Sequence, residues 1–351
     1  MSEFFTTLVQ WQRTHGRSGL PWQGTRDPYR VWLSEIMLQQ TQVSTVLTYY
    51  PRFLTRFPDV QALAAAPVDD VLALWSGLGY YTRARNLHRC AQAVVGDWGG
   101  HFPGTAQALQ TLPGIGPSTA AAIAAFCFGE RISILDGNVK RVLTRLLAFE
   151  GDLADARQER QLWQYAQALL PPQPSADDMV AYTQGLMDLG ASLCARTLPQ
   201  CLLCPVAPLC QAHQQQRAGD FPVKTRKLQR RSVPWCLLAL QRADGAIWLQ
   251  QRPHSGIWAG LYCLPVFDSL ADGLTTLAPH ADVLGEPQPH PAFRHQLTHR
   301  ELVLQPVVLP WCDTLPPPLG AETGRWVARR SELDIGLPAP VRQWLQAQLP
   351  D

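Results

Sequence analysis

The chain has 351 residues, which is long for a single hydrophobic core, and two domains are therefore expected. Its formal net charge is only +2, so a surface for a polyanion would have to be a local patch. Residues 1–3 do not begin a signal peptide, and the longest apolar stretch, at 120–128, is far shorter than the ~20 residues of a membrane span. These features predict a soluble cytoplasmic protein without a membrane partner.

The first two-thirds of the chain predicts helices almost throughout. Apolar residues recur at helical spacing, and short turns containing proline or glycine separate the segments. We expect a compact all-α domain at residues 1–210. Its expected helices lie at 4–13, 29–47, 68–74, 84–95, 106–109, 119–126, 139–147, 157–169 and 179–189.

A glycine-rich turn interrupts this helical region. Gly114 and Gly116 allow close approach of a partner to the backbone, and Ser118 follows at the start of an Ala-rich helix. The free N–H groups of a helix start favour an anion. A phosphate-binding turn and a plain structural turn both fit this pattern alone.

Two carboxylates occur in contrasting settings. Glu35 lies on an apolar helical stripe beside Trp32 and Leu38, where burial would raise its pKa toward the range of a general acid. Asp136 lies at a polar helix start, where N–H donors would keep it ionised. One protonated and one charged carboxyl is the arrangement of glycosidases. A satisfied core glutamate and an ordinary helix cap are the alternatives.

Four cysteines lie within 17 residues, a spacing that suits one metal centre. Zinc sites and a [4Fe–4S] cluster are the two candidates. Zinc folds usually present two short C-x2-C knuckles, and this segment contains a single one, which favours the iron–sulfur cluster. The expected ligands are Cys194, Cys201, Cys204 and Cys210.

The pattern changes after the cysteine segment. Residues 211–232 are polar and then basic, which indicates an interdomain linker. Beyond residue 233, strand-like stretches at 235–241, 246–251, 261–267, 301–309 and 325–327 are joined by helical patterns at 270–277 and 341–349. The sequence thus predicts an α+β domain at residues 233–351.

Together these segments resemble the MutY-type adenine DNA glycosylases of the helix-hairpin-helix superfamily, over nearly the whole chain. The match is densest between residues 20 and 210. The matching stretches are LPW at 20–22, WLSEIMLQQTQ at 32–42, WSGLGYYTRARN at 75–86, residues 112–120, LDGNVKR at 135–141, MDLGA at 187–191 and the cysteine spacing.

The resemblance implies an all-α helix-hairpin-helix domain with an iron–sulfur loop at 194–210, followed by a Nudix-like α+β domain. The hairpin would span about 105–126 and contact DNA through Gly114, Gly116 and Ser118. Glu35 would protonate the adenine ring nitrogen, and Asp136 would stabilise the sugar cation with support from Asn138.

The resemblance also assigns residues that extract and hold the base. Gln40 and Tyr80 would insert into the duplex, and Leu20, Trp22 and Gln184 would line the pocket for the flipped adenine. Flipping costs a few kcal/mol of stacking, so some such residues are physically required. Core packing of the two aromatic residues is the competing interpretation.

Ser118 bears on the reaction subtype. Relatives such as endonuclease III carry a lysine at the matching place, where its amine forms a Schiff base with the sugar. A serine cannot do this, so we expect a monofunctional enzyme that leaves an abasic site. Pro117 lies where many relatives have a basic residue, which removes one expected phosphate contact.

The second domain resembles a Nudix fold whose metal site is missing, since residues 266–275 contain only Asp268 and Asp272 as carboxylates. In MutY-type proteins this domain reads 8-oxoguanine through a Phe-Ser-His loop. Thr298 and His299 keep its polar pair here, and Leu297 replaces the aromatic residue.

The expected function is removal of adenine from double-stranded DNA when it is paired with 8-oxoguanine or guanine, by a monomer at the nucleoid. An endonuclease III-like enzyme, a thymine mismatch glycosylase and a non-catalytic DNA lesion sensor are the alternatives.

Overall fold

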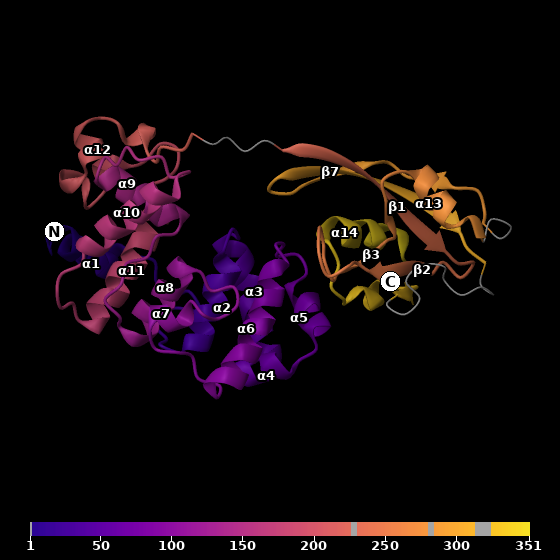
Figure 1. The fold of residues 1–351 in the computed structure, drawn as a ribbon, viewed down its shortest axis with the longest axis horizontal. Coiled ribbons are helices and arrows are strands. Elements are labelled where there is room, and N and C mark those ends of the chain that lie inside the picture. The colour runs from indigo at the N-terminus through magenta and orange to yellow at the C-terminus, as the bar shows by residue number, and fades with distance from the viewer. Residues whose placement is uncertain (1, 226–229, 280–283, 313–323) are drawn as a thin grey trace. The chain divides into compact units, whose positions relative to one another are not determined.

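The computed structural model describes residues 2–225, 230–279, 284–312 and 324–351. Its internal contacts divide the chain into two units (Figure 1). The first comprises Met1–Ala65 and Asn86–Lys227, and the second comprises Ala66–Arg85 and Leu228–Asp351. A short piece of the helical region therefore packs with the C-terminal part of the chain.

The first unit is built from helices. Its helices are α1 (Ser2–His15), α2 (Pro28–Leu38), α3 (Val43–Arg56), α4 (Val60–Ala65), most of α6 (Thr82–Trp98), α7 (Ala106–Leu109), α8 (Pro117–Phe128), α9 (Gly137–Leu146), α10 (Ala156–Ala168), α11 (Ala176–Ala191) and α12 (Gln211–Gln214), with short 3₁₀ turns η1 (Cys201–Leu203), η2 (Ala207–Leu209) and η3 (Ala218–Asp220). The all-α fold expected for this region is confirmed.

One expected helix is wrong. The stretch 29–47 is two helices, because α2 ends at Leu38 and α3 begins at Val43. Between them Gln40 adopts a left-handed φ of 57°, and the N–H of Thr41 closes a turn onto the carbonyl of Leu38. Glutamine is a good helix former, so neither propensity nor apolar spacing marks this break.

The core of the first unit joins elements from both ends of its sequence. α1 packs on α11, where the ring of Phe5 stacks on that of Tyr182 at 4.8 Å between centroids. The buried side chains of Leu8, Leu143 and Leu186 belong to the same cluster. This core fixes α8, α9 and α11, which carry or adjoin Ser118, Asp136, Asn138 and Gln184 among the residues expected at the site.

The second unit contains a mixed sheet. The described strands are β1 (Arg231–Gln241), β2 (Ile247–Gln251), β3 (Tyr262–Cys263), β4 (Val266–Phe267), β5 (Gln288–Pro289), β6 (Phe293–Gln296), β7 (Arg300–Pro310) and β8 (Gly324–Val327). The long strands β1 and β7 pair in parallel along eleven residues, and the other pairings between the described strands are antiparallel. The strand order is β3-β2-β1-β7-β5. Helices α13 (Leu270–Thr276) and α14 (Ala339–Gln348) and the turn η5 (Arg330–Leu333) complete the unit.

The segment 66–85, which contains α5 (Val68–Trp75), is held in the second unit by polar contacts. The hydroxyls of Ser76 and Tyr81 both donate to the carbonyl of Leu337, at 2.9 and 2.7 Å. The guanidinium of Arg342 donates to the Ser76 hydroxyl at 3.0 Å. These bonds join residues more than 250 positions apart, so local sequence patterns do not reveal them.

The stretch expected as a linker begins with ordered turns: α12 and η3 fall within 211–220, and α12 packs on α9. Within the described ranges, no helix has the length and apolar character needed to cross a membrane.

Candidate active site

Glu35 lies in the last two turns of α2. The helix begins at Pro28 behind Asp27, whose carboxylate accepts from the N–H of Tyr29 at 2.9 Å. Glu35 is partly buried between fully packed neighbours. Desolvation by burial, and then the negative charge of Asp136, raise its pKa to about 8. The two carboxyl groups therefore lie close enough to influence each other.

Asp136 is the N-cap of α9. Its carboxylate accepts from the N–H of Val139 at 2.7 Å, which satisfies one of the free donors of the helix start. The residue before it is held by Ser118, whose hydroxyl accepts from the N–H of Leu135 at 3.2 Å. Ser118, at the start of α8, thus positions the backbone that carries Asp136.

Asn138, in the first turn of α9, is exposed, and its side-chain oxygen accepts from Arg141 at 3.0 Å. The guanidinium of Arg141 also donates to the carbonyl oxygens of Gly190 and Cys194. The orientation of the Asn138 amide is therefore tied to the end of α11 and to the first expected cysteine ligand.

The hairpin consists of α7, a turn and α8. Gly114 has a φ of +77°, and a Cβ added there would lie 2.6 Å from the Cβ of Asn86. Gly116 is the N-cap of α8 with an extended backbone, and among described residues no atom lies within 4 Å of a Cβ built there. Gly114 is thus required by the turn, whereas Gly116 leaves an open approach to the start of the helix.

The three residues expected in the base pocket come from two elements of the first unit. Leu20 and Trp22 lie in the loop between α1 and α2, and Gln184 lies on α11. Leu20 and Gln184 are partly buried, whereas Trp22 is buried with its ring edge-to-face against Tyr50 at 5.4 Å. Trp22 therefore contributes to the core as well.

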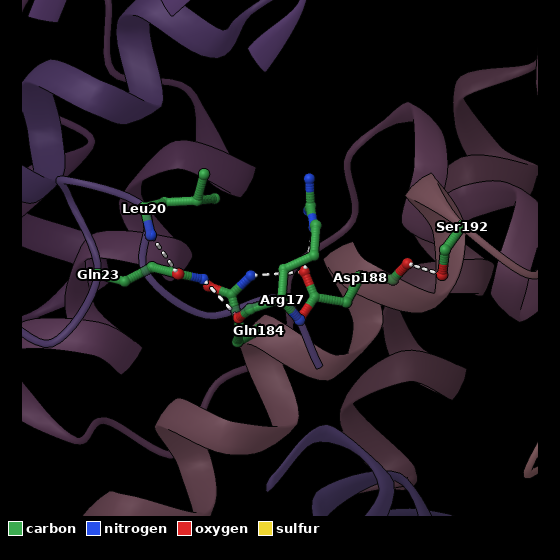
Figure 2. A network of polar contacts seen from close by, with 6 residues as sticks. All are labelled: Arg17, Leu20, Gln23, Gln184, Asp188 and Ser192. Atoms are coloured by element: carbon green, nitrogen blue, oxygen red, sulfur yellow. Dashed lines mark hydrogen bonds and ion pairs between the residues drawn. The ribbon is translucent and has the colours of Figure 1, made fainter. Parts of the chain in front are cut away.

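Figure 2 shows a polar network that joins these two elements. Its centre is an ion pair between Arg17 and the buried Asp188, with Nε and Oδ1 separated by 2.7 Å. Neither residue is among those expected at the site from the sequence. The sequence marks Asp188 only as a lone carboxylate between the apolar residues Met187 and Leu189.

The two residues expected to insert into the duplex are both exposed and both strained. Gln40 has a φ of 57° and Tyr80 a φ of 47°, a region that non-glycine residues seldom adopt. The hydroxyl of Tyr80, in the second unit, lies 3.2 Å from that of Thr298, which donates to it. The guanidinium of Arg83 lies over the Tyr80 ring at 5.6 Å.

Thr298 and His299 form the exposed turn between β6 and β7. The N–H of Leu297 donates to the carbonyl of Arg300 at 2.8 Å and closes this hairpin. Leu297 is partly buried. The two polar residues of the expected reading loop therefore lie at a hairpin tip in the second unit, and Glu35 and Asp136 belong to the first.

The four expected metal ligands line one small pocket, together with apolar residues that include Val142 and Leu189. No group of three or more His, Cys, Asp or Glu side chains in the described ranges is placed to hold a metal ion. The buried guanidinium of Arg145 donates to the sulfur of Cys194 at 3.3 Å and to the carbonyl of Ala195 at 2.7 Å. A buried positive charge beside these sulfurs suits an anionic thiolate centre.

Comparison with known proteins defines the class first. Residues 33–168 match the HhH-GPD superfamily of base excision DNA repair proteins, and residues 236–347 match a NUDIX domain. Among solved structures, a thermostable thymine-DNA glycosylase is 28% identical with a TM-score of 0.53, covering 61% of this chain and 96% of that one. An endonuclease III–DNA complex, at 20% identity and a TM-score of 0.50, has the same helical fold over 61% of this chain and 95% of its own. The helical fold is that of a base excision glycosylase.

Relatives that align over most of this chain narrow the class. The adenine DNA glycosylase of Buchnera aphidicola subsp. Baizongia pistaciae is 35% identical, covering 96% of this chain and 94% of its own length. That of Homo sapiens is 38% identical, covering 76% of this chain and 57% of its own length. The chain belongs to the adenine DNA glycosylases of the MutY type, and it removes adenine in base excision repair.

Gly114 and Gly116 should respond differently to substitution. We expect Gly114→Ala to destabilise the protein by about 1–3 kcal/mol, because alanine would have to adopt a left-handed backbone against Asn86. Gly116→Ala should cost less, because its backbone is extended and its surroundings are open. Urea unfolding measures both, and a larger loss from Gly116→Ala would contradict this assignment.

Proposed function

We propose that this glycosylase acts on adenine paired with 8-oxoguanine or guanine in double-stranded DNA, and that it hydrolyses the N-glycosidic bond to leave an abasic site. The observation that carries the catalytic part is the raised pKa of Glu35, to which burial and the charge of Asp136 both contribute. Burial and a neighbouring carboxylate keep the Glu35 carboxyl protonated at neutral pH.

Glu35 is the general acid in this proposal. With a pKa of about 8 it carries its proton at neutral pH and gives it to the ring nitrogen of adenine as the base leaves. Protonation makes adenine a neutral leaving group, so the bond to the sugar breaks without forming an anionic base.

Asp136 stabilises the positive charge that develops on the sugar. Two features support this role: the N-cap bond from Val139 and the Ser118 contact that fixes the preceding residue. An anion held in a fixed position needs no reorganisation in the transition state. Asn138, oriented by Arg141, supports the same site from the first turn of α9.

Base flipping in this proposal uses residues on both units. Leu20, Trp22 and Gln184 receive the adenine, and Gln40 and Tyr80 insert into the duplex in its place. The exposure and left-handed backbone of the two inserting residues support this, because such strain concentrates at functional positions. Stacking and unpairing energy has to be replaced by contacts of this kind.

Thr298 and His299 recognise the base opposite adenine. Their exposure at the β6–β7 hairpin tip supports the assignment, and the bond between Thr298 and Tyr80 joins this loop to an inserting residue. The hydroxyl and imidazole can both hydrogen-bond to a purine edge. Leu297 gives the loop an apolar contact in place of an aromatic stack.

Ser118 makes the enzyme monofunctional. Its hydroxyl is occupied as a hydrogen-bond acceptor for Leu135, and it has no amine for Schiff base formation. The hairpin glycines Gly114 and Gly116 and the start of α8 contact a backbone phosphate. Because every proposed residue comes from one chain, a monomer is sufficient, and we assign it to the nucleoid.

The four cysteines hold a [4Fe–4S] cluster that orders the loop 194–210. Their common pocket, the single short knuckle and the guanidinium of Arg145 at the Cys194 sulfur support this assignment. The cluster would cross-link α11, η1, η2 and α12.

A duplex panel tests the substrate. Adenine should be released when it lies opposite 8-oxoguanine or guanine and far more slowly opposite thymine, with strand breaks appearing only after alkali. Base release and strand cleavage are measured separately on denaturing gels. Release from the thymine pair alone would reject the proposed partner, and alkali-independent cleavage at the rate of base loss would reject the monofunctional mechanism.

The role of Glu35 as the acid should be visible in the pH dependence of the rate of adenine release. Single-turnover adenine release should fall about tenfold per pH unit above pH ~8, because Glu35 loses its proton there. Glu35→Gln should lower the rate by ~10²- to 10⁴-fold and remove this limb while duplex affinity is retained. A wild-type rate that stays constant from pH 7 to 10 would eliminate Glu35 as the acid.

The proposed [4Fe–4S] cluster predicts the metal content of the purified protein. Purified protein should contain about four irons per chain with visible absorbance, and Cys204→Ser should lose both. Cys312→Ser is the matched control, because Cys312 lies outside the cysteine pocket. Stoichiometric zinc with no visible absorbance would overturn the assignment.

A further inference from the structure

Asp188 is a buried carboxylate in the penultimate turn of α11, with 1% of its surface exposed. Its charge is balanced by Arg17, which donates its backbone N–H to Oδ2 at 3.0 Å and its Nε to Oδ1 at 2.7 Å. The backbone carbonyl of Asp188 accepts from the hydroxyl of Ser192 at 2.7 Å. The carboxylate is thus held at a fixed position inside the first unit (Figure 2).

The same carboxylate receives a third donor. Gln184, one helical turn earlier, donates its Nε2 to Oδ1 of Asp188 at 2.8 Å. An ionised carboxylate can only accept hydrogen bonds, so the amide of Gln184 must turn its NH₂ group toward Asp188. The amide oxygen of Gln184, which can only accept, and the second N–H of its NH₂ group remain for a ligand, and the bond to Asp188 fixes which side of the amide each one occupies.

Asp188 also fixes the loop on the other side of the network. The carbonyl of Arg17 accepts from the Nε2 of Gln23 at 3.0 Å, and the Oε1 of Gln23 accepts from the N–H of Leu20 at 3.1 Å. A chain of bonds therefore runs from Asp188 through Arg17 and Gln23 to Leu20. One buried charge anchors both elements proposed to line the base pocket.

The orientation of Gln184 has a chemical consequence. Adenine carries a donor, the N6 amino group, where a 6-keto purine such as hypoxanthine carries an acceptor oxygen. An amide oxygen matches the amino group, whereas two acceptors facing each other repel. We propose that Asp188 is a positioning residue for base specificity, which locks Gln184 as an acceptor and so selects a 6-amino over a 6-keto purine. This inference rests on the proposed pocket.

Asp188→Asn tests the lock with little change in shape. With its oxygen on the Oδ2 side, the asparagine still accepts from the backbone N–H of Arg17. Its NH₂ then faces both Gln184 and the Nε of Arg17, so the partly exposed Arg17 side chain has to turn away, and Gln184 can accept from the asparagine and present its own NH₂ to the base. The measurement is the single-turnover rate for adenine and for hypoxanthine opposite the same base. We expect the ratio of the two rates to fall ~10- to 100-fold, with adenine release slowed and hypoxanthine release quickened.

Three further variants separate specificity from folding. Asp188→Glu keeps an acceptor-only group and should retain the discrimination. Asp178→Asn is the matched control, because Asp178 lies on the same helix as Asp188 but pairs with Arg13 near the surface, at 2.7 Å. This variant should leave the ratio of the adenine and hypoxanthine rates unchanged. In a Gln184→Leu background, Asp188→Asn should no longer alter the ratio, as a double-mutant cycle requires.

The results of these experiments separate a failure of the Asp188 inference from a failure of the proposed function. If the wild type releases no adenine from any duplex, the proposed function fails. If the wild type is active and Asp188→Asn slows both bases equally, the residue is only structural and the inference fails. Should Asp188→Asn not fold, Gln184→Leu alone decides: discrimination equal to that of the wild type would overturn the proposal.

Discussion

The proximity of two carboxyl groups is the constraint on which this site depends. If Glu35 and Asp136 were both ionised in a desolvated site, their repulsion would oppose folding, so the pair is most stable with one proton between them. The structure gives the two groups different surroundings: Asp136 receives an N–H donor from its own helix, whereas Glu35 is enclosed by apolar packing. The proton therefore resides on Glu35, which is the carboxyl we propose as the acid.

Holding that pair in place requires several elements to be fixed against one another. Gln39, the residue that caps the end of α2, donates to the hydroxyl of Thr119 on α8 at 3.3 Å, one residue beyond Ser118. Ser118 in turn fixes the chain just before Asp136. The start of α8 thus contacts both the end of the helix that carries Glu35 and the segment just before Asp136. Ser118 therefore fixes the geometry of the site through its hydroxyl, in addition to lacking the amine that a lysine would supply.

The sequence predicted the features that depend on local pattern. Helical periodicity located the helices, cysteine spacing identified the pocket residues, and the contrast between an apolar stripe and a polar helix start singled out Glu35 and Asp136. It failed where contacts are distant or weakly patterned. Arg17 and Asp188 are separated by 171 positions, and β5 has only two residues, so neither the ion pair nor the strand leaves a periodic signal. The break at Gln40 was missed because glutamine favours helices and only the surrounding packing imposes the turn.

The residues with a left-handed backbone show how tertiary contacts hold a conformation that the local sequence does not favour. A left-handed backbone at a non-glycine residue costs about 1–3 kcal/mol and persists only where its surroundings fix it. Around Tyr80 those surroundings are specific: Arg83 donates to the carbonyls of Leu78 and Gly79, and its guanidinium lies over the Tyr80 ring. Burial lowers the pKa of Arg83 to about 10, yet it remains charged at neutral pH. The cation thus stabilises the turn and presents the ring at the surface, where the Thr298 hydroxyl donates to the phenol oxygen. The strain at Tyr80 is therefore maintained by a partly buried charge, which can hold an aromatic side chain exposed where apolar packing alone would draw it into the core.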